Sequence, residues 1–382
     1  MIPLSVPNLK GNEKKYLLDA LDKGWVSTSG SYVTKFEQDM AAYLNTKGAA
    51  AVQSGTAAIH LALLLSGVNS ENEVIVPTLT FIAAVNPVKY IGAEPVFMDC
   101  DDSLNMDCCK LEDFLKKECQ MTPLGLQNKR TNRIIKAIIV VHIFGNMADM
   151  ERLRAFADEY GIQLIEDATE ALGTCYTQGE YKGQFAGTIG DFGAYSFNGN
   201  KIITTGGGGM LTAKDDKALE KAKYLAAQAK DDPLHYTHNE IGFNYRMTNL
   251  QAALGVAQLE CLEDFIQIKE KNYQYYSDAI KSMEGFELLK FHDKTRSNHW
   301  FYSLLIQKSG LSRDTAMKKL KEADIETRPI WQLIHTQKMY RNNQTYYIEK
   351  APFYRNSVMN IPCSTNLLRK DMDHIIQMLK SL

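Results

Sequence analysis

Short strand-like runs alternate with amphipathic segments over the first two thirds of the chain. Apolar residues recur at helical spacing from Val33 to Leu44, and the apolar run at 49–53 has the length of a strand. Further strand-like runs lie at 74–76, 96–98, 134–141 and 163–165, and helical patterns lie at 57–65, 111–119 and 150–160. Such alternation predicts an α/β architecture, with a mostly parallel sheet flanked by helices.

The pattern changes near residue 249, where a helical stretch is predicted to run to about residue 282. A possible strand at 300–306 and helices at 315–323 and 370–379 follow, which is typical of a smaller α+β domain. The 382 residues exceed twice the ~150 of an average domain. We therefore predict a large cofactor-binding α/β domain at 1–255, including the N-terminal segment, and a small C-terminal α+β domain at 256–382. Residues 120–132 lack apolar periodicity and are expected to form a surface loop.

Composition narrows the class of protein. Hydrophobic residues make up 45% and charged residues 23%, which is ordinary for a globular chain. The formal net charge of −2 gives no electrostatic reason to expect nucleic acid or an anionic membrane as partner. Seven cysteines without a CxxC pair argue against a disulfide framework or a metal site. No secretion signal and no run of ~20 apolar residues is present, so we expect a soluble, cytoplasmic protein.

Three polar groups are candidates for ligand binding, and the first two follow predicted strands, where ligands bind in an open parallel sheet. Ser54-Gly55-Thr56 begins a helix and suits a phosphate, although an ordinary helix cap is the alternative. Asp167 follows a strand and is either a solvated carboxylate or a partner for a cationic ring. Lys201 lies between turn formers and the glycines 206–209, a setting that suits an amine forming a Schiff base. The fingerprints of dinucleotide, P-loop and zinc-protease sites are missing.

These residues resemble a known family, the fold-type I pyridoxal phosphate aminotransferases of nucleotide sugars, often called DegT/DnrJ/StrS. The resemblance covers nearly the whole chain and depends on the order and spacing of many short segments. The segments are Gly24-Trp25-Val26-Ser27, Phe36-Glu37, Ser54-Gly55-Thr56-Ala57-Ala58, Pro77-Thr78-Leu79-Thr80-Phe81, Pro95-Val96-Phe97-Met98-Asp99, Val141-His142-Ile143-Phe144-Gly145, Glu166-Asp167-Ala168, Ser196-Phe197-Asn198-Gly199-Asn200-Lys201, Gly242-Phe243-Asn244-Tyr245-Arg246-Met247 and Arg328-Pro329-Ile330-Trp331.

The resemblance implies roles for individual residues. Lys201 looks like the Schiff-base lysine, which would also carry the proton between substrate and cofactor. Asp167 looks like the partner of the pyridinium nitrogen, and Phe81 like the aromatic ring that stacks on the cofactor. The expected contacts of the cofactor phosphate are Gly55, Thr56, Ala57 and Ser196.

Asn244 resembles a residue that reaches the cofactor phosphate of a neighbouring subunit, so the resemblance implies a homodimer with shared active sites. Four residues are candidate substrate contacts: His142, Arg328, Trp331 and His335. Three of them have a plain alternative, since His142 could be a hydrogen-bonded core histidine, Arg328 a surface charge and Trp331 a core ring.

Two departures from the family pattern stand out. Glu170 occupies a cofactor-binding position where the family commonly has Gln, and 206–209 is Gly-Gly-Gly-Gly where Gly-Glu-Gly-Gly is frequent. Glu170 and its surrounding segments resemble the LegC-like and perosamine synthase-like branches, which aminate C4 of a 4-keto-6-deoxy sugar nucleotide.

The resemblance therefore implies transfer of an amino group from L-glutamate to the C4 ketone of a UDP-, GDP- or dTDP-linked 4-keto-6-deoxy sugar. Pyridoxal phosphate would alternate with pyridoxamine phosphate, and the product would serve surface-glycan or nonulosonic acid synthesis. Alternatives are a nucleotide-sugar 3-aminotransferase, a dehydratase that uses the same cofactor without a lysine, a regulator that binds cofactor or sugar, and a nicotinamide-dependent oxidoreductase. Lys201 disfavours the dehydratase, and the missing glycine fingerprint disfavours the oxidoreductase.

Overall fold

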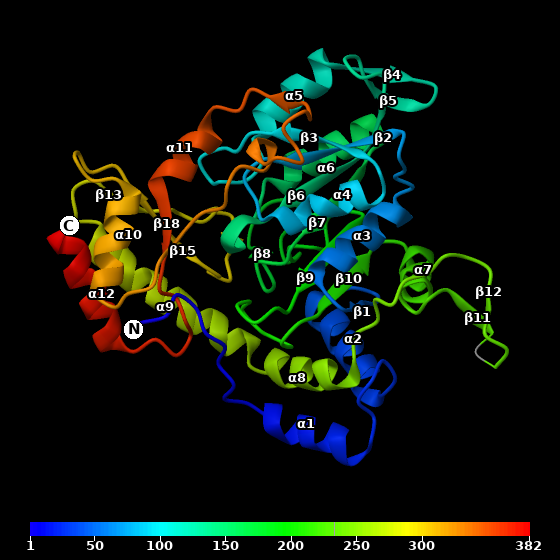
Figure 1. Ribbon diagram of the computed structural model, residues 1–382, viewed down its shortest axis with the longest axis horizontal. Coiled ribbons are helices and arrows are strands. Elements are labelled where there is room, and N and C mark those ends of the chain that lie inside the picture. Colours follow the sequence, from blue (N-terminus) through cyan, green and yellow to red (C-terminus); the bar gives the residue numbers. More distant parts are fainter. Residues whose placement is uncertain (233) are drawn as a thin grey trace.

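A ten-stranded sheet forms the centre of the computed structural model, which describes residues 1–232 and 234–382 (Figure 1). Its main path, in spatial order, is β1 (Ala50–Val52), β10 (Gly209–Ala213), β9 (Phe192–Ser196), β7 (Gln163–Asp167), β6 (Ile134–Val141), β2 (Asn72–Pro77), β3 (Glu94–Met98) and β17 (Thr345–Tyr346). The hairpin of β4 (Cys119–Thr122) and β5 (Gly125–Asn128) joins this sheet through β6.

Strand direction decides where the site lies. The pairs β9–β7, β7–β6, β6–β2, β2–β3 and β3–β17 are parallel. Strand β10 runs antiparallel to both β9 and β1, so β1 points the same way as the parallel set. The carboxyl ends of β1, β7 and β9 therefore meet at one edge, where α/β sheets bind ligands.

Helices flank this sheet and link its strands, as Figure 1 shows. The α-helices of this part are α1 (Glu13–Asp22), α2 (Ser31–Leu44), α3 (Gly55–Leu65), α4 (Asn86–Tyr90), α5 (Cys108–Lys117), α6 (Met150–Tyr160), α7 (Asp216–Ala226) and α8 (Asn249–Leu259), with 3-10 turns η1 (Ile82–Ala84) and η2 (Ile143–Gly145). Helix α3 is buried along most of its length and packs against β7, β9 and β10. The α/β class and the mostly parallel sheet are thus confirmed.

A second, antiparallel sheet of four strands lies in the C-terminal part of the chain. Its spatial order is β13 (Phe286–Leu288), β15 (Tyr302–Ile306), β18 (Val358–Ile361) and β16 (Arg328–Pro329). The accompanying helices are α9 (Leu262–Ile280), α10 (Arg313–Glu322), η3 (Ile334–Thr336), α11 (Lys350–Ser357) and α12 (Arg369–Ser381). Two small ladders complete the fold: β11 (Lys230–Asp232) with β12 (Thr237–His238), and β8 (Cys175–Tyr176) with β14 (Thr295–Arg296).

Two predicted elements differ from the structure. The predicted helix at 249–282 is interrupted at Glu260 and Cys261, which separate α8 from α9. The predicted surface loop at 120–132 instead contains the hairpin of β4 and β5, whose polar side chains hid its pairing. The division at 255/256 stays a prediction, and it falls inside α8. The N-terminal residues bond to the C-terminal part, because Ile2 N–H donates to Asp324 O.

All seven cysteines are free thiols. Cys109 on α5 is exposed, whereas the other thiols are buried or half-buried. Within the described ranges, no helix is both long and apolar enough to cross a membrane. Those ranges also contain no group of three or more His, Cys, Asp or Glu side chains placed to hold a metal ion.

Candidate active site

A cavity of about 630 Å³ opens at the carboxyl ends of the parallel strands and is lined by both sheets. It brings together most of the predicted site residues: Gly55, Thr56, Phe81, Asp167, Glu170, Ser196, Lys201, Arg328 and Trp331. The predicted residues that do not line it are Ala57, His142, Asn244 and His335.

Lys201 lies in the turn that follows β9. Its backbone N–H donates to Asn198 O at 3.0 Å, and its side chain is only 13% exposed. Burial lowers the pKa of the Lys201 amine, because the cation loses its hydration, while the nearby carboxylates of Glu170 and Asp167 oppose this shift. A buried amine with a lowered pKa is suited to nucleophilic attack.

Asp167 ends β7 and points into the same cavity. Its Oδ1 accepts the Thr169 N–H at 3.0 Å, and Asp167 is only 4% exposed. Burial raises the pKa of Asp167, although the bond from Thr169 and the charge of Lys201 oppose the rise. Such a desolvated carboxylate gains stability when a cationic ring approaches it.

Glu170 is the acidic group nearest to the lysine. Its Oε1 lies 3.9 Å from Lys201 Nζ, and its Oε2 accepts the Phe144 N–H at 2.8 Å. Phe144 has φ 56°, in the left-handed region that costs energy for a non-glycine residue, and this turn aims its N–H at the carboxylate. Burial raises the pKa of Glu170 to about 7, against the influence of Lys201. Glu170 is therefore a carboxyl that changes its protonation state near neutral pH beside the lysine amine.

The N-terminus of α3 forms one wall of the cavity. Ser54 caps the helix, because its Oγ accepts the Ala57 N–H at 3.1 Å. The first turn of a helix presents backbone N–H groups and the positive end of the dipole, a combination that binds anions. Gly55 fits closely here, since a Cβ at this position would lie 2.7 Å from Thr169 Cγ2. Ala57 contributes its backbone to the cap and not to the cavity lining.

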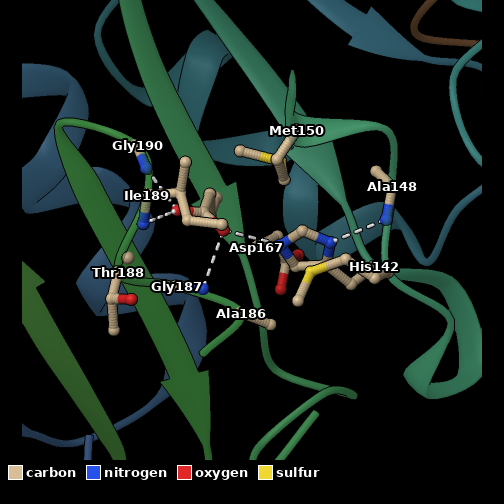
Figure 2. A network of polar contacts seen from close by, with 12 residues as sticks. His142, Ala148, Met150, Asp167, Ala186, Gly187, Thr188, Ile189 and Gly190 are labelled. Carbon is tan, nitrogen blue, oxygen red and sulfur yellow. Dashed lines mark hydrogen bonds and ion pairs between the residues drawn. The ribbon is translucent and has the colours of Figure 1, made fainter. Parts of the chain in front are cut away.

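His142 lies in a buried network of polar contacts (Figure 2) and does not line the cavity. Its Nδ1 accepts the Ala148 N–H at 3.1 Å, so Nε2 carries the proton that it donates to Glu166 Oε2 at 2.8 Å. Glu166 also accepts backbone N–H groups from Gly187, Ile189 and Gly190. Both ring nitrogens are therefore occupied within the protein core. The structure favours the core-histidine alternative over a substrate contact.

The remaining predicted contacts divide between the cavity and its surroundings. Trp331 stacks on Phe144 with ring centroids 4.7 Å apart. The ring centroid of Phe81 lies 6.4 Å from that of Trp331, and about half of the Phe81 surface is exposed. Arg328 pairs with Glu326 at 2.6 Å at the cavity wall. His335 contacts Thr78 Oγ1 through Nδ1 at 2.5 Å and does not line the cavity.

Sequence reasoning missed Trp300, whose ring contacts the lysine. Lys201 Nζ lies 4.1 Å from the centroid of the Trp300 ring. The residue precedes β15, and its apolar neighbours Phe301 and Tyr302 made it look like part of a core strand. The available signal was compositional, since the chain has only three tryptophans.

The whole chain resembles known aminotransferases. A model of the DegT/DnrJ/EryC1/StrS aminotransferase family matches residues 7–380. The protein named "Putative pyridoxal phosphate-dependent aminotransferase EpsN" of Bacillus subtilis (strain 168) is 38% identical, over 100% of this chain and 95% of EpsN. GDP-perosamine synthase of Caulobacter vibrioides is 37% identical, over 98% of this chain and 96% of the synthase.

Among solved structures, the aminotransferase TlmJ from Streptoalloteichus hindustanus has the same fold. It superposes with a TM-score of 0.89 at 24% sequence identity, over 100% of this chain and 98% of TlmJ. The family match and the two relatives each span nearly the full length. The chain therefore belongs to the DegT/DnrJ/EryC1/StrS aminotransferase family.

Proposed function

We propose that this aminotransferase uses pyridoxal phosphate to move an amino group from L-glutamate to the C4 ketone of a nucleotide-linked 4-keto-6-deoxy sugar. One observation carries the proposal: the buried amine of Lys201 and the buried carboxylate of Asp167 line one cavity beside the N-terminus of α3. The relatives named for this chemistry support it, since GDP-perosamine synthase is a sugar aminotransferase.

The residues of the cavity fit the cofactor. A phosphate group matches the anion-binding N-terminus of α3, with Thr56 and Ser196 as nearby hydroxyls. Asp167 offers a carboxylate to a cationic ring nitrogen, and Phe81 offers an aromatic face. Lys201 would supply the amine for a covalent bond to the aldehyde carbon of the cofactor. The volume of about 630 Å³ leaves room for a substrate as well.

The chain's own residues perform the binding and the proton transfers. When bound, pyridoxal phosphate supplies an electron sink that stabilises negative charge on the substrate carbon. Asp167 keeps the proton on the ring nitrogen, because its desolvated carboxylate is stabilised by that positive charge. Lys201 Nζ takes the proton from the substrate carbon, and its lowered pKa leaves the amine free to accept it. Glu170 Oε1, 3.9 Å from Lys201 Nζ, places a second titratable group beside the lysine.

We propose that the active unit is a homodimer that shares its sites. Asn244 does not line the cavity of its own chain, in agreement with a role toward a partner subunit. Large apolar side chains nearby in sequence are exposed, with Tyr236 at 74% and Ile241 at 87%. A partner surface would cover them.

The decisive experiment offers the purified protein L-glutamate with a panel of UDP-, GDP- and dTDP-linked 4-keto-6-deoxy sugars. We expect 2-oxoglutarate and one 4-amino sugar nucleotide, identified by mass spectrometry and NMR. Lys201→Ala is the control, because it should keep the fold but lose both products and the bond to cofactor that borohydride traps. No amine from any member of the panel would contradict the C4 assignment.

Lys201 in the cavity opposes the dehydratase alternative, which lacks the lysine. A protein that binds the cofactor but forms no 2-oxoglutarate from glutamate would instead be the regulator considered above.

A further inference from the structure

Trp300 joins the C-terminal part of the chain to the lysine of the large sheet. Its ring is 3% exposed and lines the cavity. Lys201 Nζ lies over this ring, 4.1 Å from the centroid. The indole Nε1–H donates to Asn200 O at 2.8 Å, so the same side chain also holds the backbone next to the lysine.

Other contacts hold the backbone and the ring of Trp300 in place. The Trp300 N–H donates to Asn298 Oδ1 at 2.9 Å, and the Trp300 carbonyl accepts Lys269 Nζ at 2.9 Å. The ring stacks on Phe301, with centroids 4.0 Å apart and planes 11° apart. A side chain held at its backbone, its ring face and its N–H loses little further entropy when it binds a cation.

Acidic groups face the amine from the other elements packed around it. Glu170 Oε1 lies 3.9 Å from Lys201 Nζ, and Asp167 at the end of β7 acts on the amine through its charge. Asn298 links the two sides, because its Nδ2 donates to Glu170 O at 2.9 Å while its Oδ1 holds Trp300. The carboxylate and the aromatic ring thus belong to one connected unit.

We propose that Trp300 is a positioning residue for Lys201: its ring and Glu170 form a holding site for the free amine whenever the lysine is not bonded to cofactor. This inference rests on the proposed function, in which the amine is released between the two half-reactions. A four-carbon stem would otherwise sample many rotamers, whereas the holding site keeps the amine inside the cavity, beside Glu170 and the Trp300 ring. An aromatic face attracts a cation most strongly where water is excluded, as here.

The test measures the amine directly in full-length protein stripped of cofactor. The rate of reductive methylation of Lys201 is followed by peptide mass spectrometry from pH 6 to 11, and only the neutral amine reacts. Trp300→Leu keeps the site apolar but removes the aromatic face. We therefore expect the pKa of Lys201 to fall by about one unit, which is roughly a tenfold faster reaction at pH values below it.

Two further variants sharpen the test. Trp300→Phe keeps a weaker aromatic face but loses the indole N–H, so we expect a smaller fall in the pKa of Lys201. Trp25→Leu is the matched control, since Trp25 is 57% exposed and lies outside the cavity, and it should leave the reaction unchanged.

An unchanged pKa of Lys201 in folded Trp300→Leu overturns the proposal. Should that variant fail to fold, Trp300→Phe decides in the same way, because an unchanged pKa there also overturns it. The measurement needs neither glutamate nor a sugar, so failure of the sugar panel and failure of this inference are separate results.

Discussion

Asp167, Glu170 and Lys201 share one desolvated pocket, and their ionisation states depend on one another. Burial raises the pKa of both acids and lowers that of the amine. Each shift favours the neutral form, so the bare cavity disfavours charge that a cationic, phosphorylated ligand would compensate. Ionising these residues costs free energy in the empty cavity, and a ligand of complementary charge would lower that cost.

Asp167→Asn separates catalysis from folding. Removing one partner of a buried ion pair costs about 3–5 kcal/mol, so turnover should fall roughly a hundredfold or more. The free energy of unfolding of the cofactor-free variant should not fall at neutral pH, because the raised pKa shows that the fold disfavours the carboxylate. Turnover and urea unfolding measure the two effects. Equal turnover in variant and parent would reduce Asp167 to a structural residue.

Glu170→Gln should change how stability depends on pH. The folded pKa of Glu170, about 7, lies above its usual value of 4.5, so the folded state binds the proton more tightly than the unfolded state between these values. This group therefore lowers the free energy of unfolding as pH rises from 4.5 to 7, by up to about 1.4 kcal/mol per pH unit. Cofactor-free Glu170→Gln should lack this decrease. Parallel curves for the two proteins would contradict the assignment.

Helix α3 is the element that connects the sheet to the proposed phosphate site. It begins directly after β1, and its cap residue Ser54 bridges to Gly208, just before β10. A Cβ at Gly209 would lie 2.4 Å from the Ser54 carbonyl carbon, so only glycine allows this approach. The glycine at position 209 thus allows the start of α3 to lie close against the start of β10.

Ser54→Ala should lower both stability and cofactor affinity. Loss of the N-cap costs about 1 kcal/mol in the free energy of unfolding. Ser312→Ala is the matched control, because Ser312 caps α10 with the same geometry, 3.1 Å to the Thr315 N–H, away from the cavity. Both variants should lose similar stability in urea, but only Ser54→Ala should raise the Kd for pyridoxal phosphate. Equal Kd values for Ser54→Ala and Ser312→Ala would contradict a role of α3 in binding the phosphate.

The elements that sequence predicted best are those with an apolar signal of their own. Strand β6 and helix α6 have the predicted bounds, since β6 is an apolar run that is buried along most of its length and α6 buries one face. The hairpin of β4 and β5 was missed because its strands are short and no regular alternation of apolar residues marks their buried side. The break between α8 and α9 was missed because apolar spacing continues across it.

The candidate site was predictable where one motif carries several residues, as around Asp167 and Lys201. Contacts between distant segments were not, because nothing local in sequence reveals them. Trp300 reaches Lys201 across a separation of about a hundred residues, and the pair between His142 and Glu166 depends on β6 lying beside β7.

At the scale of the molecule, one cavity depends on both sheets. Arg328 comes from β16 of the C-terminal sheet, while Lys201 follows β9 of the large sheet. The N-terminal segment also bonds to the C-terminal part, since Leu4 N–H donates to Glu326 Oε2 at 3.1 Å. Movement of the C-terminal part relative to the large sheet would therefore change the shape of the site.

Mixing two inactive variants tests whether sites are shared between subunits. Lys201→Ala and Asn244→Ala each damage both sites of a homodimer. A mixed dimer contains one site with an intact lysine and an intact partner asparagine, so an equal, fully exchanged mixture should regain about a quarter of parental turnover. Turnover of the mixture equal to the mean of the two variants would place Asn244 outside the partner's site.

Cys109 gives such exchange experiments a convenient reporter. It is the exposed thiol on α5, with an Arg152 guanidinium nitrogen 3.3 Å from its sulfur, and it does not line the cavity. A maleimide dye should attach there before it reaches the buried thiols. Protein labelled with donor in one batch and acceptor in another would then report subunit mixing by energy transfer, with no engineered cysteine.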